Sequence, residues 1–165
     1  AVVSYINGYV EMVLQAGMLY TTGPQQEAFI AYKRCDEKVG LKAGQKLIKG
    51  MFAESSFGEV VRMLSILGSG GSSSIEKKLK KKKQKYLFVG LVCVREEYQG
   101  QGYMRKALEL AFAEGNRLGL PVVLDTDAKL KSDKYRHLGM ELAGVRTCKN
   151  GSKLYELIKY PDSTV

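Results

Sequence analysis

The sequence predicts an α/β fold built on a mixed sheet, in which some strands run parallel and others antiparallel. The main observation is an apolar run over Tyr86–Val94 that leads through two glycines into an amphipathic helix over Met104–Leu118. A second apolar strand follows at Pro121–Asp125, and such a strand–helix–strand unit places its two strands parallel. Near the C-terminus, two strands at Met140–Thr147 and Lys153–Lys159 flank a turn and are expected to pair antiparallel.

The remaining elements follow from apolar periodicity and from glycines that end helices. Three glycines, Gly17, Gly119 and Gly139, stand within three residues of the ends of predicted helices, where a left-handed residue commonly ends a helix. Helical spacing covers Val2–Leu14, Leu41–Phe52, Phe57–Leu67 and Ser132–Leu138, and strand-like runs cover Met18–Thr22 and Glu27–Lys33. The two strand-like runs flank a turn and are expected to form an antiparallel hairpin.

The length of 165 residues favours a single domain with one sizeable core. Residues 1–165 are therefore interpreted as one domain that carries a helical and lysine-rich insertion at about 35–85, ahead of the strand at Tyr86–Val94. Within the insertion, the composition of Gly68–Ser74 is typical of a flexible connector. The segment after it, Ile75–Lys85, is interpreted as either a lysine-rich helix or a disordered run.

Composition excludes several classes of protein. No apolar run approaches the ~20 residues of a membrane span, and no secretory leader is visible. The three cysteines, Cys35, Cys93 and Cys148, are widely spaced, so neither a disulfide framework nor a zinc site is expected. A cytoplasmic location is the expectation that fits these features. The chain starts without Met inside a helix-like segment, so we expect that upstream residues are missing.

The turn between the main strand and its helix predicts an anion site. Gly100 and Gly102 allow a positive φ and a close approach of a ligand to the backbone. The N-terminus of the following helix carries unpaired N–H groups and a partial positive charge that attract phosphate oxygens. The spacing excludes a dinucleotide fingerprint, because Arg105 stands where the third glycine belongs, and no Walker loop is present.

This turn resembles the acetyl-CoA motif of the GNAT acetyltransferase superfamily, Q/R-x-x-G-x-G/A, read here over Gln99–Met104 with a departure at Met104. A second segment, Lys134–Met140, is similar to the Y-x-x-x-G-F segment of that family. The resemblance implies a GNAT-like mixed sheet whose parallel central strands splay around the cofactor, with helices on both faces. The first strand and helix of the family are expected to be missing from this chain.

The same resemblance implies acetyl-CoA as cosubstrate and no metal. The pantetheine arm is expected to lie in the splay between the two parallel strands. The cofactor-binding residues implied are Val92, Cys93 and Val94, whose backbone would meet the arm, and Gln99, Gly100, Gln101, Gly102, Tyr103 and Met104, whose turn would hold the pyrophosphate.

Tyr135 is the expected catalytic residue, because the family commonly uses a tyrosine at this place. A phenol within hydrogen-bond reach can protonate the thiolate that leaves when an amine attacks a thioester. The alternative is a tyrosine that only packs its ring against the sheet. Four residues before this tyrosine the family frequently has an Asn, and this chain has Lys131 there. The contact that such an Asn makes with the cofactor arm is therefore not expected in this protein.

No general base is evident, because Tyr86–Val94 contains no acid. Glu96 and Glu97 are interpreted as solvated loop carboxylates, and the base is left as a water chain, a residue of the insertion or a missing upstream residue. His137, the only histidine, is interpreted as an exposed helix-end residue. Cys93 is interpreted as a small buried hydrophobe and not as a nucleophile.

The lysine run concentrates the charge of the chain. The net charge is +9, and without the seven lysines of this run it would be +2. The seven are Lys77, Lys78, Lys80, Lys81, Lys82, Lys83 and Lys85. Three interpretations stay open: a solvated surface run, an electrostatic site for an acidic partner, RNA or a membrane surface, or an aid in recruiting anionic CoA. The lack of aromatic residues among the lysines counts against base stacking.

The resemblance thus implies an N-acetyltransferase that transfers an acetyl group from acetyl-CoA to a primary amine by direct attack. The alternative is a non-catalytic CoA-binding module that docks on an acidic partner through its lysines. The expected partner is a small-molecule or peptide amine acceptor, neither nucleic acid nor a membrane span is expected, and homodimer formation is left open.

Overall fold

The computed structural model describes residues 2–53, 73–148 and 151–162, together with positions 56, 58 and 61. The chain divides into two compact units, one of residues 1–19 and 37–71 and the other of residues 20–36 and 72–165. Most of the predicted helix over Phe57–Leu67, of the connector Gly68–Ser74 and of the turn at 149–151 lies outside the described residues.

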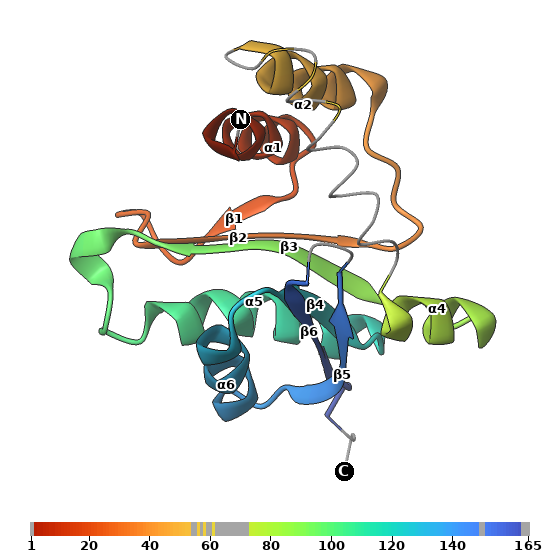
Figure 1. Cartoon of the computed structure of the whole chain (residues 1–165). Coiled ribbons are helices and arrows are strands. Elements are labelled where there is room, and N and C mark those ends of the chain that lie inside the picture. Colours follow the sequence, from red (N-terminus) through yellow and green to blue (C-terminus); the bar gives the residue numbers. More distant parts are fainter. Residues whose placement is uncertain are drawn as a thin grey trace. The chain divides into compact units, whose positions relative to one another are not determined.

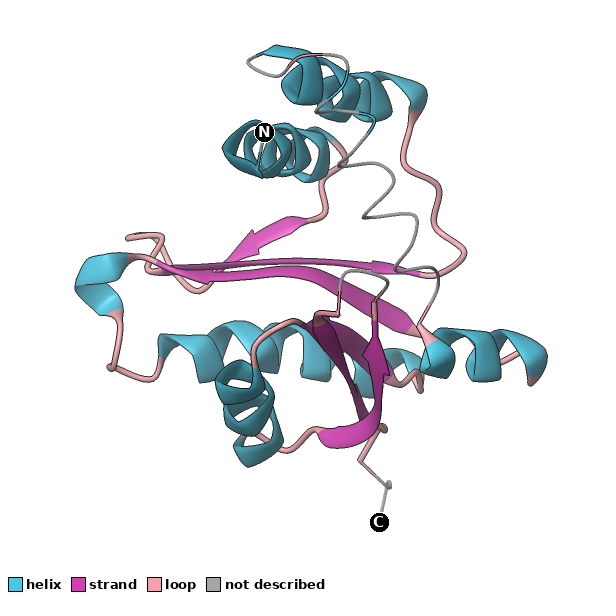
Figure 2. Cartoon of the chain, in the orientation of Figure 1, coloured by secondary structure: helices cyan, strands magenta, loops and turns pink. Residues whose placement is uncertain are grey.

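Six strands form one sheet in the order β1–β2–β3–β4–β6–β5 (Figures 1 and 2). Their bounds are β1 Leu19–Thr21, β2 Ala28–Arg34, β3 Leu87–Val94, β4 Val122–Thr126, β5 Glu141–Thr147 and β6 Lys153–Lys159. The β3–β4 pair is parallel, whereas the β2–β3, β4–β6 and β5–β6 pairs are antiparallel. The predicted mixed α/β sheet is therefore confirmed, including both C-terminal strands.

The larger core lies between one face of this sheet and two helices, α5 (Tyr103–Leu118) and α6 (Lys129–His137). Its buried members are Ala28, Ile30, Leu87, Val89, Ala107, Leu108, Ala111, Phe112, Val122, Leu124, Tyr135, Met140 and Leu157. Close packing of α5 on β4 needs a glycine, because a Cβ at Gly115 would lie 2.7 Å from Cγ2 of Val122. Gly119 and Gly139 end α5 and α6 with positive φ, as predicted.

A second, smaller core lies on the opposite face of the sheet, under α4 (Ser74–Lys81). Ile75 and Leu79 of α4 are buried there, together with Tyr86, Val123 and Ile158. Successive side chains of a strand point to opposite faces, so β4 and β6 each supply both cores. The lysine-rich segment is thus a helix with a buried face and not a disordered run, because its two apolar residues, four positions apart, meet the sheet.

Local hydrogen bonds start α4 at the residue that precedes it. The Ser73 side chain accepts from the Glu76 amide at 3.1 Å, and the Glu76 carboxylate accepts from the Ser73 amide at 3.1 Å. The Tyr86 hydroxyl donates to the other Glu76 oxygen at 2.7 Å. Burial and then this contact raise the pKa of Tyr86. The Ser-x-x-Glu pattern at 73–76 is a helix-start signal that our sequence analysis missed.

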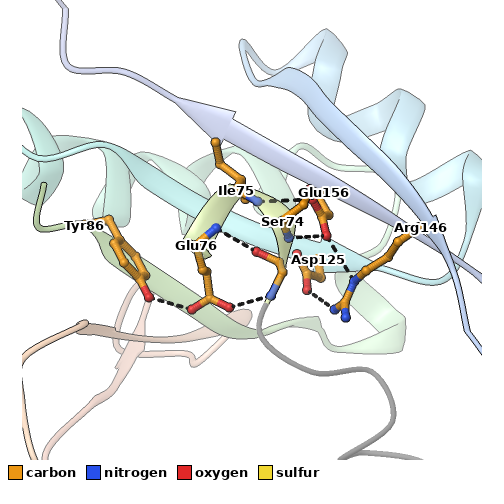
Figure 3. Close-up of polar contacts among 8 residues, drawn as sticks. Ser74, Ile75, Glu76, Tyr86, Asp125, Arg146 and Glu156 are labelled. Atoms are coloured by element: carbon orange, nitrogen blue, oxygen red, sulfur yellow. Dashed lines mark hydrogen bonds and ion pairs between the residues drawn. The ribbon is translucent and has the colours of Figure 1, made fainter. Parts of the chain in front are cut away.

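A buried carboxylate of a distant strand also holds α4 in place (Figure 3). The Glu156 side chain is 0% exposed and accepts from the amides of Ser74 at 2.9 Å and Ile75 at 3.3 Å, and from the Ser74 hydroxyl. First-turn amides lack intrahelical partners and form the positive end of the helix dipole, so the carboxylate stabilises α4 there. Nε of Arg146 lies 3.0 Å from Oε1 of Glu156, and Nη2 of Arg146 lies 2.9 Å from Oδ2 of Asp125. These two ion pairs link β6, β5 and β4.

The other unit contains two helices that pack against each other, α1 (Val2–Gln15) and α2 (Leu41–Ala53). Both match the predicted helices at Val2–Leu14 and Leu41–Phe52, and Gly17 follows α1 with a φ of +69°. Among the described residues, no helix combines the length and the apolar character needed to cross a membrane.

Neutralising Glu156 should destabilise the fold although it changes little volume. Glu156→Gln places an amide NH₂ against the first-turn amides of α4 and removes the charge that Arg146 meets. We expect the free energy of unfolding to fall by about 3–5 kcal/mol, the usual range for breaking a buried ion pair. Urea unfolding measures this loss, with Glu109→Gln on the exposed face of α5 as the control. Equal stability of the two variants would contradict the assigned role of Glu156.

Candidate active site

The two parallel strands of the sheet separate soon after they meet. Only Leu87 and Phe88 of β3 have register partners in β4, which are Val122 and Val123. Both strands then continue, β3 as far as Val94. Beyond these two pairs, the facing edges of β3 and β4 are not paired with each other. This opening is the splay that the family resemblance implied.

A bulge in β3 coincides with the start of this opening. Ala31 of β2 faces Leu91 and Tyr32 faces Val89, so Gly90 has no partner in the register. A bulge of one extra residue bends its strand and increases the local twist, and an isolated glycine inside a strand is a common sign of one. Gly90 is thus a residue that shapes the site and that our sequence analysis passed over.

The hydrogen-bonding pattern between β2 and β3 decides which backbone groups of β3 face the opening. Residues that exchange hydrogen bonds in an antiparallel pair alternate with residues whose N–H and C=O point away from the partner. The Arg95 amide donates to the Glu27 carbonyl at 3.0 Å, and the register continues from there into β3. Cys93 is therefore bonded to β2, whereas Val92 and Val94 turn their backbone groups toward the opening.

The bulge also reverses the side-chain alternation along β3. Val92 and Val94 pack against the larger core, so Cys93 falls on the opposite face, where its side chain is exposed. Our interpretation of Cys93 as a buried hydrophobe is wrong for this reason.

The glycine turn follows β3 and lies at one end of it, far along the strand from α4 (Figure 1). Gly100 and Gly102 both have positive φ, +75° and +82°. Gly102 is the N-cap of α5 and offers no side chain, and the first turn of α5 holds no acidic residue. Among the described residues, no hydrogen bond occupies the amides of positions 100–105. Such a row of free amides at a helix start forms a concave anion site.

Two glutamines brace this turn through their side chains. Gln99 Nε2 donates to the Val94 carbonyl at 3.3 Å, and Gln101 Nε2 donates to the Glu97 carbonyl at 2.8 Å. The Met104 side chain packs against the larger core. The departure from the family motif at Met104 therefore affects packing and leaves its first-turn amide in place.

Aromatic and basic side chains surround the turn. The Tyr98 and Tyr103 rings meet edge to face at 5.4 Å, and the Lys106 ammonium lies 4.4 Å from the Tyr103 ring centroid. Arg105 and Lys106 are exposed in the first turns of α5, so their positive charges add to the field of the helix N-terminus.

Tyr135 lies on α6, which a connection of two residues joins to β4, at the edge of the sheet where the strands separate. The side chain belongs to the larger core and is 6% exposed. Burial raises the pKa of its phenol above the usual value, so the group keeps its proton at neutral pH. Within the described part of the chain, its hydroxyl has no hydrogen-bond partner, which leaves the O–H free to donate to a ligand.

The other polar residues singled out from the sequence lie at the surface. Glu96 and Glu97 are exposed, and Glu97 pairs with Arg95, as expected of solvated loop carboxylates. His137 and Lys131 are exposed on α6, which confirms the interpretation of His137 as a surface residue.

The Asp125–Arg146–Glu156 group was missed because its members are far apart in the sequence. Asp125 and Glu156 are register partners in β4 and β6, and both interrupt apolar strands, which was the available signal. Burial raises the pKa of Asp125, and the Arg146 guanidinium opposes this shift. No group of three or more His, Cys, Asp or Glu side chains in the described residues is placed to hold a metal ion.

Comparison with solved structures gives matches to the fold. A polyamine N-acetyltransferase of Drosophila melanogaster is 13% identical over 91% of this chain and 79% of that chain, with a TM-score of 0.57. An arylalkylamine N-acetyltransferase 2 of Aedes aegypti is 10% identical over 91% and 76%, with a TM-score of 0.59. At these identities the likeness establishes the fold alone.

Another match, a proposed acetyltransferase of Agrobacterium tumefaciens, is 27% identical, but the alignment covers 46% of this chain and 56% of that one at a TM-score of 0.41. This chain thus spans just over half of that protein's length. A comparison with curated proteins gave no match.

The sequence profile of the acetyltransferase (GNAT) family matches residues 20–135, which is more than half of the chain. The matched range includes the open β3–β4 edge, the glycine turn and Tyr135. The chain therefore belongs to the GNAT family of acetyltransferases. Both the resemblance and the expected enzyme class are confirmed.

A charge placed at the glycine turn should weaken the binding of CoA. The wild-type protein is expected to bind acetyl-CoA with a Kd in the micromolar range, on the order of −7 to −8 kcal/mol. Gly102→Asp puts a carboxylate beside the free amides, whereas Gly102→Asn adds the same bulk and tolerates the same positive φ without the charge. We expect Asp to weaken the affinity at least about 10-fold more than Asn. Calorimetry that finds both variants equal would exclude an anion site at this turn.

Proposed function

We propose that this protein transfers the acetyl group of acetyl-CoA to a primary amine. The observation that carries the proposal is the short β3–β4 pairing, which leaves the facing edges of the two strands unpaired with each other beside a turn of free amides. The opening suits an extended chain with amide groups, and the turn suits a pyrophosphate. The family to which the chain belongs supports the same assignment.

Each part of the site has a role in this proposal. The backbone of Val92 and Val94 holds the pantetheine arm, while Cys93 contributes to the strand through its ladder with β2. The turn from Gln99 to Met104 holds the pyrophosphate, with the amides of Gln101, Gly102, Tyr103 and Met104 as donors and Gly100 nearby. The whole chain acts as one acetyltransferase domain with the insertion at about 35–85.

Tyr135 acts as the general acid. The amine nitrogen bonds to the acetyl carbon, the carbon–sulfur bond breaks, and the phenol proton passes to the departing thiolate. The nitrogen loses one proton to water as the amide forms, and the phenolate regains a proton from water, so the phenol is restored. A phenol that is buried, protonated and without a partner in the described protein suits this role. No metal or covalent acyl-enzyme is part of the proposed reaction.

Small amines are the acceptors to test first. Two structures with this fold are described as a polyamine and an arylalkylamine N-acetyltransferase. A thiol-release assay with acetyl-CoA against pooled polyamines, agmatine, arylalkylamines, amino acids and peptides tests transfer directly. Thiol release with one class of amine supports the proposal. CoA binding without release in any pool would favour the non-catalytic module.

Removal of one hydroxyl should separate catalysis from binding. Tyr135→Phe keeps the packing in the core and leaves the turn and the β3 backbone unchanged, so CoA affinity should be retained. Turnover with the best acceptor should fall by about 10²–10⁴-fold, the usual effect of losing a positioned general acid. The loss should affect kcat and kcat/KM alike, because the interaction develops only in the transition state.

The matched control for this change is Tyr160→Phe, which removes a hydroxyl from a tyrosine that is 47% exposed. Its turnover should equal that of the wild type. If Tyr135→Phe kept more than about a third of the wild-type kcat with chemistry rate-limiting, Tyr135 would be a packing residue.

A further inference from the structure

The outer surface of α4 carries an unusual concentration of positive charge. All seven lysines between positions 77 and 85 are exposed. Lys85 pairs with Asp36 at 2.8 Å. The other six, which we call the basic surface, have no carboxylate partner among the described residues. They are Lys77, Lys78, Lys80, Lys81, Lys82 and Lys83.

Helix stability explains only part of this charge. Lys78, Lys80 and Lys81 lie in the last turn of α4, where a cation interacts favourably with the helix dipole. That interaction falls off within one turn, and several like charges so close together repel one another. The interaction with the helix dipole therefore accounts for the lysines of the last turn and not for all six.

The basic surface is also held in a fixed place. Ile75 and Leu79 are buried under α4, Ser73 caps its start, and Glu156 accepts its first amides. The lysines therefore project from a docked helix and not from a loose tail. Binding to such a surface requires little ordering of its backbone, which preserves affinity.

The position of α4 separates this surface from the proposed CoA site. α4 comes before β3 and the glycine turn comes after it (Figure 1). An eight-residue strand such as β3 is about 26 Å long. Because the turn lies a whole strand away, the basic surface is not part of the pyrophosphate site.

The lysines are spread around the helix, which restricts the shape of a partner. Residues of a helix are about 100° apart, so Lys77, Lys80 and Lys81 point away from the buried side while Lys78 lies on one flank. Lys82 is the C-cap of α4, and Lys83 follows it with a φ of +55°. A flat membrane would meet only the outer three, and α4 has no exposed apolar side chain to insert. An extended chain can follow all of them.

The chemistry of the surface favours carboxylates over nucleic acid. It contains no arginine, the residue that pairs with phosphate in a bidentate manner, and no exposed aromatic ring on which a base could stack. Lysines act as point charges that pair with any nearby anion. The Lys85–Asp36 pair shows such a contact within the chain itself.

We propose that the basic surface of α4 binds an extended acidic segment of a partner protein, a run of Asp and Glu residues. The surface then localises the enzyme to that partner. This role is separate from acetyl transfer and does not depend on the acceptor amine.

Fluorescence anisotropy with a labelled oligoglutamate peptide of about ten residues tests the proposal. The variant Lys77→Gln/Lys80→Gln/Lys81→Gln removes three charges of the basic surface, and Lys38→Gln/Lys42→Gln/Lys153→Gln removes three exposed charges elsewhere. We expect the first variant to bind at least about 10-fold more weakly and the control to stay within about two-fold of the wild type. Affinity of the wild type should fall steadily between about 50 and about 200 mM NaCl.

Two further arms decide the class of partner. An RNA oligonucleotide of equal charge and phosphatidylserine vesicles are titrated at the same salt concentration. Tighter binding of RNA or of vesicles than of the peptide would overturn the choice of an acidic protein segment. Equal peptide affinity of the two triple variants would overturn the basic surface itself. Urea unfolding of both variants confirms that they fold alike, and acetyl-CoA affinity should be the same in both.

Discussion

The separation of β3 from β4 after two residue pairs is the constraint on which the proposed site depends. Backbone N–H and C=O groups need partners, and a parallel neighbour would normally supply them. β4 pairs along its whole length with β6 on its other side, but it meets β3 only at Leu87 and Phe88. The open edge therefore offers a strand-like ligand the hydrogen bonds that β3 and β4 would otherwise have made with each other.

The position of this opening follows from local chemistry. Gly90 permits the bulge that bends β3, and the two later glycines permit the turn into α5 with its amides free. Parallel strands end at the same edge of the sheet, so the helices that follow β3 and β4 both start beside the opening. This arrangement brings the glycine turn and the Tyr135 helix to one edge although about 35 residues separate them in the chain.

The opposite face of the sheet serves a different purpose. There the side chain of Glu156 accepts the first amides of α4 and meets Arg146, which in turn meets Asp125 (Figure 3). A buried carboxylate without these partners would be strongly unfavourable, so the group has to form as a whole. It fixes a helix that is almost entirely basic on its outside, where charge repulsion alone would favour an extended chain.

The sequence by itself determined the six strands and the helices α1, α2, α5 and α6, because apolar periodicity and the left-handed glycines act within a few residues of each other. It also predicted the glycine turn, since Gly100, Gly102 and the helix start are adjacent in the chain. Tertiary structure decided the exposure of Cys93, the buried face of α4 and the carboxylate–arginine group. Each of these depends on a register, a bulge or a pairing between strands, and such contacts join residues whose distance along the chain carries no sign of them.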